Sequence, residues 1–282
     1  MNYRHAFHAG NHADVLKHAV LALVVSYLAL KDKSFAVLDA HAGIGAYDLL
    51  GPQALKTDEW RGGVGLMGPQ FSPEIEALLK PYRACLAALN PAGGERYYPG
   101  SPEIILQNLR ASDRLIANEL HPEDADTLEG NYRAEPRMRV TRLDALGAIK
   151  AQLPFAERRG LVVIDPPYEA VDETQRVAKQ LREGIKRFAT GTFIIWYPVT
   201  TDEFASRFIA EIKALAVANI LQAELRVKIP HPQTGLAGSG LLIVNPPFVL
   251  EAQLQKLLPA LSVRLGVAGR GRSQVTWLTP PT

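Results

Sequence analysis

The sequence predicts an α/β protein built on a mostly parallel β-sheet that helices cover on both faces. Short apolar runs alternate with segments of helical periodicity along most of the chain, which is the pattern of βα units. Acidic residues stand at or just after the ends of the first four predicted parallel strands, and open sheets bind ligands at that edge. The chain is 47% hydrophobic and 21% charged, as expected of a globular protein with a sizeable core.

The N-terminal part begins with a predicted helix over residues 11–30, where apolar residues recur at helical spacing and Asn11 is a suitable N-cap. Its longest apolar stretch, 19–30, is shorter than a membrane span requires, so a buried helix is expected. The apolar run 35–39 predicts the first strand. A glycine-rich turn through Gly45 is expected to lead into another helix.

The segment 51–96 is richer in turns than its surroundings. Pairs such as Gly62-Gly63 and Asn90-Pro91 interrupt two predicted helices, over 73–80 and 82–89. We interpret 51–96 as a small helical subdomain inserted into a domain formed by residues 1–50 and 97–282. Ser101 then predicts an N-cap, with proline at the first helical position, for a helix that ends near residue 110.

The rest of the chain alternates between strands and helices. Strands are predicted over 114–119, 138–142, 160–165, 192–197, 220–228 and 240–244, and helices over 122–132, 145–152, 174–188, 202–216 and 250–258. With the run 35–39 this gives a seven-stranded sheet. Because no helix separates the last two strands, they are expected to pair antiparallel at one edge.

Length and composition narrow the class of protein. At about 150 residues per domain, 282 residues correspond to one large domain with an insertion or to two ordinary domains. The single cysteine, Cys85, excludes an internal disulfide framework, and a cytoplasmic enzyme is expected. The net charge of +2 is not the strong basic excess of many nucleic-acid-binding proteins, so such binding would use a local basic patch.

The turn after the first predicted strand suits a nucleoside-bearing cofactor. Gly43 and Gly45 allow a tight turn and a close approach of a ligand to the backbone, and Glu119, which ends the next strand, is placed to accept hydrogen bonds from ribose hydroxyls. Asp39 and His41 flank the same turn. The two glycines alone also fit an ordinary strand-to-helix turn, and the chain lacks the Gly-Lys-Ser/Thr of a phosphate-binding P-loop.

The sequence Asp165-Pro166-Pro167-Tyr168 ends the strand predicted over 160–165. The two prolines stiffen the turn, so the Asp165 carboxylate and the Pro166 carbonyl form a row of acceptors beside an aromatic ring. Such a row can hold both N–H groups of a ring-bound amine while Tyr168 stacks on the ring, which directs the nitrogen lone pair at an electrophile. A rigid loop with a helix-capping aspartate is the alternative.

A similar sequence, Asn245-Pro246-Pro247-Phe248, follows the last predicted strand. Because that strand is expected to run antiparallel to the others, its carboxyl end points away from the ligand-binding edge. We therefore prefer Asp165 as the functional residue. Asn245 is interpreted as a turn residue before the helix 250–258.

Histidines and basic residues form further clusters. Five of the seven histidines lie within the first 41 residues, but neither cysteines nor a His-Glu-x-x-His pairing accompanies them. We therefore expect no metal site and interpret them as polar lining of a cofactor or RNA pocket, or as surface histidines. Basic groups near strand ends, with Tyr3 and Arg4, are candidates for contacting phosphates and bases, or are solvated; they include Arg158-Arg159 and Lys186-Arg187.

Segments along nearly the whole chain are similar to those of one enzyme family. They cover 3–18, 38–45, 97–102, 118–122, 159–160, 164–168, 186–191 and 196–198. The chain resembles the bacterial S-adenosylmethionine-dependent methyltransferases that methylate the N6 amine of an adenine in 23S ribosomal RNA. Asp165-Pro-Pro-Tyr168 is typical of amino-group methylation in general, whereas the segment 3–18 points to this family.

The resemblance implies a Rossmann-like class I methyltransferase fold, S-adenosyl-L-methionine as cofactor and 23S ribosomal RNA as partner. It implies that Asp165 acts in catalysis and that Tyr3 lies near the substrate base. We assign Pro166 and Tyr168 to the same catalytic group, and Arg4, Lys17 and Tyr168 to substrate binding. The expected cofactor-binding residues are His18, His41, Gly43, Ser101, Glu119, Asp144, Ala145 and Asp165.

We therefore expect transfer of a sulfonium methyl group to adenine N6 after the base flips out of its RNA. A DNA adenine-N6 methyltransferase is the first alternative, and methylation of a protein glutamine amide, for which asparagine at position 165 would be more familiar, is the second. A nucleic-acid-binding module without turnover is the non-enzymatic alternative. A monomer without membrane contact or an obligate protein partner is expected.

Overall fold

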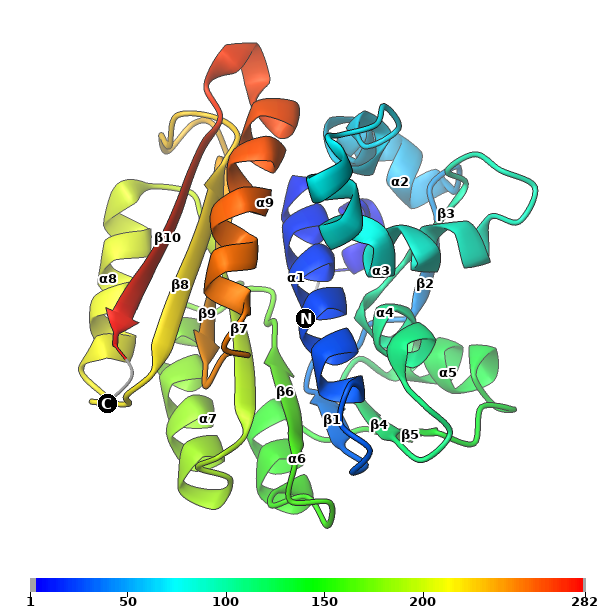
Figure 1. Cartoon of the computed structure of the whole chain (residues 1–282), viewed down its shortest axis with the longest axis vertical. Helices are drawn as coiled ribbons and strands as arrows, with labels where there is room; N and C mark the ends of the chain where they lie inside the picture. Colours follow the sequence, from blue (N-terminus) through cyan, green and yellow to red (C-terminus); the bar gives the residue numbers. More distant parts are fainter. Residues whose placement is uncertain (1–3, 281–282) are drawn as a thin grey trace.

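The computed structural model describes residues 4–280, and across them one eight-stranded sheet lies between two layers of helices (Figure 1). The strand order is β10-β8-β9-β7-β6-β1-β4-β5. The strands are β1 (Ala36–Asp39), β4 (Arg114–Asn118), β5 (Met138–Thr141), β6 (Gly160–Ile164), β7 (Thr192–Val199), β8 (Ile220–Arg226), β9 (Gly238–Val244) and β10 (Arg272–Thr279). The five strands from β7 to β5 in this order are parallel, which confirms the mostly parallel, Rossmann-like α/β class.

Two hydrophobic cores separate the sheet from its helical layers. One core joins the sheet to α1 (His12–Ala29), α3 (Pro73–Leu89), α4 (Ser101–Asn108) and α9 (Leu250–Leu265). The other joins it to α6 (Ala145–Gln152), α7 (Glu173–Arg187) and α8 (Asp202–Lys213). Two further helices are α2 (Pro52–Thr57) and α5 (Pro122–Asn131), and short 3-10 turns cover His5–Phe7, Glu59–Gly62, Val64–Leu66 and Val267–Gly269.

Helix α1 is the central element of its layer. Its N-cap is Asn11, as predicted, because the Asn11 side chain accepts hydrogen bonds from the backbone N–H groups of Ala13 and Asp14. By length and composition alone α1 could cross a membrane, but 78% of it is buried inside the protein. Burial of this extent is typical of a core helix, so the polar residues of α1 lie inside the protein.

The glycine-rich turn after β1 leads into a strand, so the helix predicted there is wrong. Strand β2 (Ala46–Asp48) pairs antiparallel with β3 (Tyr97–Pro99), with Tyr47 opposite Tyr98. Gly100 donates a backbone hydrogen bond to the Gly45 carbonyl at 2.7 Å. This pairing provides the backbone hydrogen bonds that a helix would have provided. It also brings the chain back to the glycine-rich turn, so that Ser101 lies beside that turn.

The segment between β2 and β3 is helical, but α3 is one helix where two were predicted. Pro81 lies inside it, and buried Leu79 and Tyr82 flank Pro81 in the same core as α1. Packing on both sides outweighs the single hydrogen bond that the proline removes. The residues expected to form a separate subdomain therefore share the main core, and the division at residues 51 and 96 stays a prediction. Gly100, and not Ser101, is the N-cap of α4.

The last strand, β10, was not predicted. Over its first six residues the side chains alternate between exposed and half-buried, and none of the strand is fully buried. It pairs antiparallel with β8 and forms the edge of the sheet. The antiparallel β8–β9 pairing was predicted correctly, but its predicted place at the edge was wrong. Helix α9 also runs past Pro259 to Leu265, further than expected.

Asn245 has the structural role predicted for it. Strand β9 runs antiparallel to β7, with Val244 opposite Phe193, so Asn245 lies at the amino end of β7. Its side-chain amide donates to the carbonyls of Ala189 and Gly191, both at 2.9 Å. Asn245 therefore ties two turns together at the end of the sheet away from the carboxyl ends of the parallel strands.

Candidate active site

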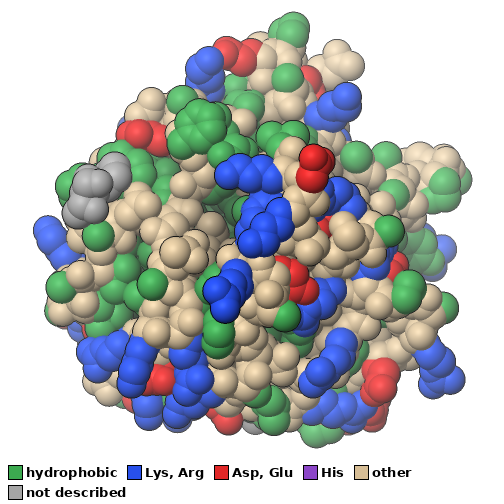
Figure 2. All heavy atoms as spheres, turned by 60° about the horizontal axis from the view of Figure 1, so that its bottom comes forward, with side chains coloured by type: hydrophobic (Ala, Val, Ile, Leu, Met, Phe, Trp, Pro, Cys, Tyr) green, Lys and Arg blue, Asp and Glu red, His purple; other side chains and the backbone are tan. Residues whose placement is uncertain are grey.

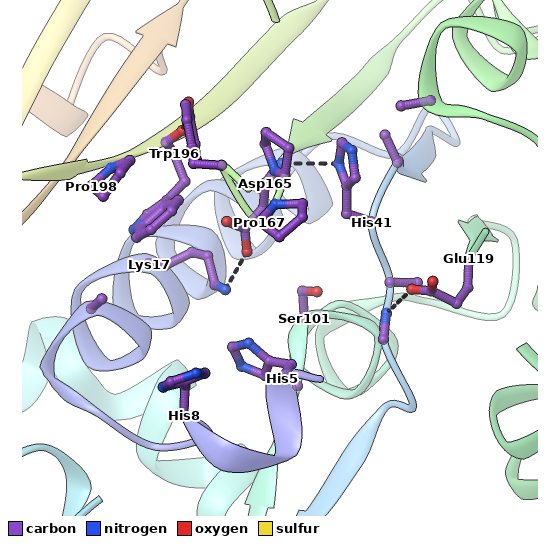
Figure 3. Close-up of a pocket in the computed structure, with 18 of the residues that line it drawn as sticks. His5, His8, Lys17, His41, Ser101, Glu119, Asp165, Pro167, Trp196 and Pro198 are labelled. Atoms are coloured by element: carbon purple, nitrogen blue, oxygen red, sulfur yellow. Dashed lines mark hydrogen bonds and ion pairs between the residues drawn. The ribbon is translucent and has the colours of Figure 1, made fainter. Parts of the chain in front are cut away.

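A cavity of about 780 Å³ lies at the carboxyl ends of the parallel strands (Figure 3). The chain turns to opposite sides of the sheet after β1 and β6, and such a switch point forms a ligand crevice in open α/β sheets. The predicted residues that line it are Lys17, His18, His41, Gly43, Ser101, Glu119, Asp144, Ala145, Asp165, Pro166 and Tyr168. Tyr3 lies outside the described residues. The functional roles of all these residues stay proposals.

The glycine turn is held by Glu119, which follows β4. Its two carboxylate oxygens accept backbone hydrogen bonds from Gly43 and His121, each at 2.8 Å. Gly43 has a φ of +62°, and a Cβ there would lie 2.2 Å from the Tyr47 hydroxyl, so only glycine fits. Burial raises the pKa of Glu119. Each carboxylate oxygen keeps a lone pair for a ligand, which suits the predicted contact with ribose hydroxyls.

Asp39 lies behind the turn and does not line the cavity. Its carboxylate is fully buried and accepts a hydrogen bond from the His41 N–H at 3.3 Å. Burial raises the pKa of Asp39 to about 6. This residue therefore shapes the turn from behind, while Glu119 lines the cavity. Asp144 similarly caps α6 by accepting from the Gly147 N–H at 3.0 Å, which places Asp144 and Ala145 at the cavity wall.

A buried ion-pair cluster joins α1 to the loop after β6. The Lys17 amine lies 3.0 Å from Asp14 and also pairs with the Asp165 carboxylate. Asp14 in turn accepts from the Gly10 N–H and from His5, each at 2.9 Å. Burial opposes the charge on Lys17, but Asp14 and Asp165 outweigh it and raise the pKa of the amine above its usual value. Lys17 therefore stays protonated.

Asp165 is held from two sides. Its backbone N–H donates to Nδ1 of His41 at 3.1 Å, and its carboxylate pairs directly with the Lys17 amine (Figure 3). Because His41 Nδ1 accepts, the ring proton resides on Nε2, and burial lowers the pKa of His41 to about 4. The residue at the N-cap of α7 is Asp172, so Asp165 is not the helix-capping aspartate of the alternative interpretation.

Aromatic side chains form the wall beside Asp165. The Tyr168 hydroxyl donates to the Trp196 carbonyl on β7 at 2.7 Å, and its ring lies edge-on to Trp196 at 5.7 Å. The backbone of Tyr168 has a φ of +54°, a conformation that fixes the direction of the side chain. Trp196 and Pro198 also line the cavity. Tyr168 is thus anchored at the wall, and β7 adds a second aromatic ring.

Several residues of the site were not singled out from the sequence. Asp14 carries a signal in hindsight, because an acid three residues before Lys17 in an apolar helix needs a buried partner. Trp196, Leu120 and His121 fall within segments of the family resemblance but had no assigned role. Arg4 pairs with Glu123 at 2.7 Å and Asp124 at 2.9 Å on α5, so its contact with RNA stays a prediction.

The basic pairs at strand ends do not lie at the ligand-binding edge of the sheet, where they were candidates for contacting RNA. The pairs Arg158-Arg159 and Lys186-Arg187 precede β6 and β7, at the end of the sheet opposite the cavity. Within residues 4–280, no group of three or more His, Cys, Asp or Glu side chains is placed to hold a metal ion.

Three histidines whose pKa is lowered make the stability of the protein sensitive to acid. Burial lowers the pKa of His12 and His41 to about 4 and that of His18 to about 3. Below pH 6.5 the unfolded chain therefore binds protons that the folded chain does not. The free energy of unfolding decreases as the pH is lowered, by up to about 1.4 kcal/mol per pH unit for each histidine. Asp39, whose pKa is raised, opposes this trend between about pH 6 and 4.

We expect the free energy of unfolding, measured with urea, to be lower at pH 5 than at pH 7. The variant His18→Gln isolates one contribution and is expected to flatten the slope. A stability that stays constant over this range in the wild type would contradict the prediction.

Comparisons with known proteins agree with the geometry. The family model described as "Ribosomal RNA large subunit methyltransferase D, RlmJ" matches residues 32–279. Proteins described as ribosomal RNA large subunit methyltransferase J, from Haemophilus influenzae and Escherichia coli, are each 42% identical to this chain and cover 99% of it and 99% of their own length. A crystal structure of protein LPL1258 from Legionella pneumophila has a TM-score of 0.86 at 28% identity and covers 96% of this chain and 98% of its own.

Proposed function

Because the chain belongs to the RlmJ family of ribosomal RNA large subunit methyltransferases, we propose that it methylates the N6 amine of an adenine in 23S ribosomal RNA. Family membership establishes an S-adenosyl-L-methionine-dependent methyltransferase of ribosomal RNA. The observation that supports the adenine amine as its target is Asp165-Pro166-Pro167-Tyr168 at the carboxyl end of β6, with the Asp165 carboxylate facing the cavity beside the glycine turn. We further propose that the enzyme acts in the cytoplasm as a monomer.

The residues present fit the cofactor. Glu119 keeps acceptor capacity for ribose hydroxyls, and Leu120 and Ala145 provide apolar surface for a purine ring. Within the described chain, Nε2 of His18 and Nδ1 of His121 are buried in the cavity lining without a hydrogen-bond partner, so both are open to a polar ligand. S-adenosyl-L-methionine, when bound, supplies a methyl group on a sulfonium sulfur.

The chain's own residues hold and orient the amine. The Asp165 carboxylate and the Pro166 carbonyl accept its N–H groups, which turns the nitrogen lone pair toward the cofactor side of the cavity. Tyr168 and Trp196 enclose the ring from the β7 side. An aromatic amine becomes acidic only as its new bond forms, so the Asp165 carboxylate first orients the amine and then takes up the proton that the methylated nitrogen releases. Lys17 balances the charge of Asp165 throughout.

The experiment that tests the function offers the purified enzyme protein-free 23S ribosomal RNA and duplex DNA in parallel, with methyl-labelled cofactor. We expect label in the RNA alone, at an adenine N6 that mapping of the modified position identifies. Label in DNA would favour the first alternative, a DNA adenine methyltransferase. Label at a ring nitrogen or at a base other than adenine would contradict the proposal.

Replacing Glu119 by alanine is expected to weaken cofactor binding. The change removes a ribose acceptor and also releases the N–H groups of Gly43 and His121. Hydrogen bonds to a charged group contribute about 1.5–3 kcal/mol, so we expect the Kd for S-adenosyl-L-methionine to rise by one to two orders of magnitude in calorimetric titration. The control is Glu129→Ala. Glu129 lies on α5, and its replacement removes an exposed ion-pair partner of Arg142. An unchanged Kd in Glu119→Ala would remove Glu119 from the cofactor site.

A further inference from the structure

An exposed aromatic residue lies at the end of the sheet opposite the cavity. No residue at that end has a role in the proposed mechanism. The Phe248 side chain is 84% exposed, and its ring meets the edge of Tyr27 at 5.9 Å. Phe248 follows Asn245, whose amide ties this turn to the turn after α7. The turn that carries Asn245 and Phe248 therefore contacts both α1 and the turn after α7.

Basic residues lie in the segments that precede β1, β6 and β7, at the same end of the sheet as this aromatic pair. Arg159 donates to the carbonyls of Leu28 and Lys33, so its guanidinium lies between the end of α1 and the loop before β1. Lys31 and Lys33 lie on that loop, and Lys186 lies in the last turn of α7. We call the set Tyr27, Lys31, Lys33, Arg159, Lys186 and Phe248 the Phe248 surface.

The charges of the Phe248 surface are largely uncompensated. Lys31, Lys33 and Lys186 are exposed, and within residues 4–280 no carboxylate forms an ion pair with any of them. Figure 2 turns this end of the molecule toward the viewer and shows Lys and Arg side chains beside a hollow lined by hydrophobic side chains. An exposed ring among unpaired cations is the arrangement that binds unpaired nucleotides, because the ring stacks on a base while the cations hold phosphates.

We infer that the Phe248 surface is a second RNA-binding site, which stacks one unpaired base on Phe248 and holds the neighbouring phosphates with Lys31, Lys33 and Lys186. The inference rests on the proposed function, since it assigns a further part of the same ribosomal RNA to this surface. Strand β6 has five residues and spans about 17 Å, so the RNA must reach at least that far from the nucleotide in the cavity. The full RNA reaches that distance, whereas a fragment cut back to within about 17 Å of the target nucleotide does not.

The test compares protein-free 23S ribosomal RNA with the shortest fragment of it that the wild-type enzyme still methylates. The variants are Phe248→Ala, Phe248→Tyr and the double variant Lys31→Gln/Lys33→Gln. The control is Lys80→Gln/Arg139→Gln, which removes the same charge from exposed positions on α3 and β5. Binding is measured over a series of salt concentrations, and kcat is measured with both RNAs.

We expect Phe248→Ala and the double lysine variant each to weaken binding of the full RNA by about tenfold, while kcat and binding of the short fragment stay at the wild-type values. The lysine variant should also lower the slope of log K against log salt by about two, because two phosphate contacts are lost. Phe248→Tyr, which keeps the ring, should bind as the wild type does.

The outcomes separate the inference from the function on which it rests. If the wild type methylates neither RNA, the proposed function fails. If it methylates both while the variants bind the full RNA as the control does, the inference is wrong. Variants that lose methylation only on an assembled ribosomal particle would assign the surface to a ribosomal protein and would also overturn it. Phe248 is so exposed that its replacement is expected to leave the unfolding midpoint unchanged, and the lysine variant tests the same surface independently.

Discussion

Replacing Asp165 by alanine is expected to reduce methyl transfer by about a thousandfold or more. The change removes the acceptor that orients the amine in the cavity, and orientation and charge placement of this kind account for two to four orders of magnitude in rate. The fold should survive, because Lys17 keeps Asp14 as an ion-pair partner at 3.0 Å. The measurement is single-turnover incorporation of labelled methyl groups into 23S ribosomal RNA.

Two further variants control this experiment. Asp172→Ala removes an exposed carboxylate near the same loop, one that only pairs with Arg176, and should leave turnover unchanged. Asp165→Asn keeps one acceptor oxygen and loses the charge, so we expect a rate between those of the wild type and the alanine variant. An alanine variant within tenfold of the wild-type rate, with unfolding unchanged, would remove Asp165 from the mechanism.

Replacing Asp14 by alanine is expected to destabilise the protein by about 3–5 kcal/mol. Asp14 is buried and compensates Lys17, and its loss leaves a buried ammonium with only Asp165 as a partner and the Gly10 N–H without an acceptor. Burial opposes the charge on Asp14, but His5 and Lys17 outweigh it and hold the pKa of Asp14 well below its usual value. Its contribution is therefore present at neutral pH and is lost as the pH falls below about 4.

Urea unfolding at pH 7 measures this effect, and an exposed pair provides the control. Glu74→Ala breaks the surface pair with Lys256 and should cost about 1 kcal/mol or less. The double variant Asp14→Ala/Lys17→Met should be more stable than Asp14→Ala alone, because it removes the uncompensated charge as well. If the double variant is no more stable than the single one, the cost does not arise from the buried ammonium.

The sequence predicted the parallel sheet well because its strands are continuous apolar runs. The strand predicted over 160–165 and the helix over 145–152 agree with β6 and α6 to within a residue. Strand β6 is buried along its whole length, so its local composition alone determines it. Strand β10 is the opposite case, since its alternating residues become a strand only when β8 provides a partner.

Long-range contacts explain the other differences. A glycine turn after a strand usually opens a helix, but the residues after Gly45 pair instead with β3, about fifty positions further along the chain. Pro81 usually interrupts a helix, but packing against α1 holds α3 together. At the site, residues at strand ends were predictable from the sheet edge they share. Asp14 and Trp196 were not, because their place in the cavity depends on how α1 and β7 pack.

Helix α1 contributes to both the main core and the cavity, since its apolar residues hold two layers together while Asp14, Lys17 and His18 line the cavity. Directed evolution of this enzyme would therefore meet a constraint: libraries selected for heat resistance and libraries selected for turnover would draw on the same eighteen positions. Improvements of the two properties should seldom combine there, and the helices on the other side of the sheet would be the better place to seek stabilising changes.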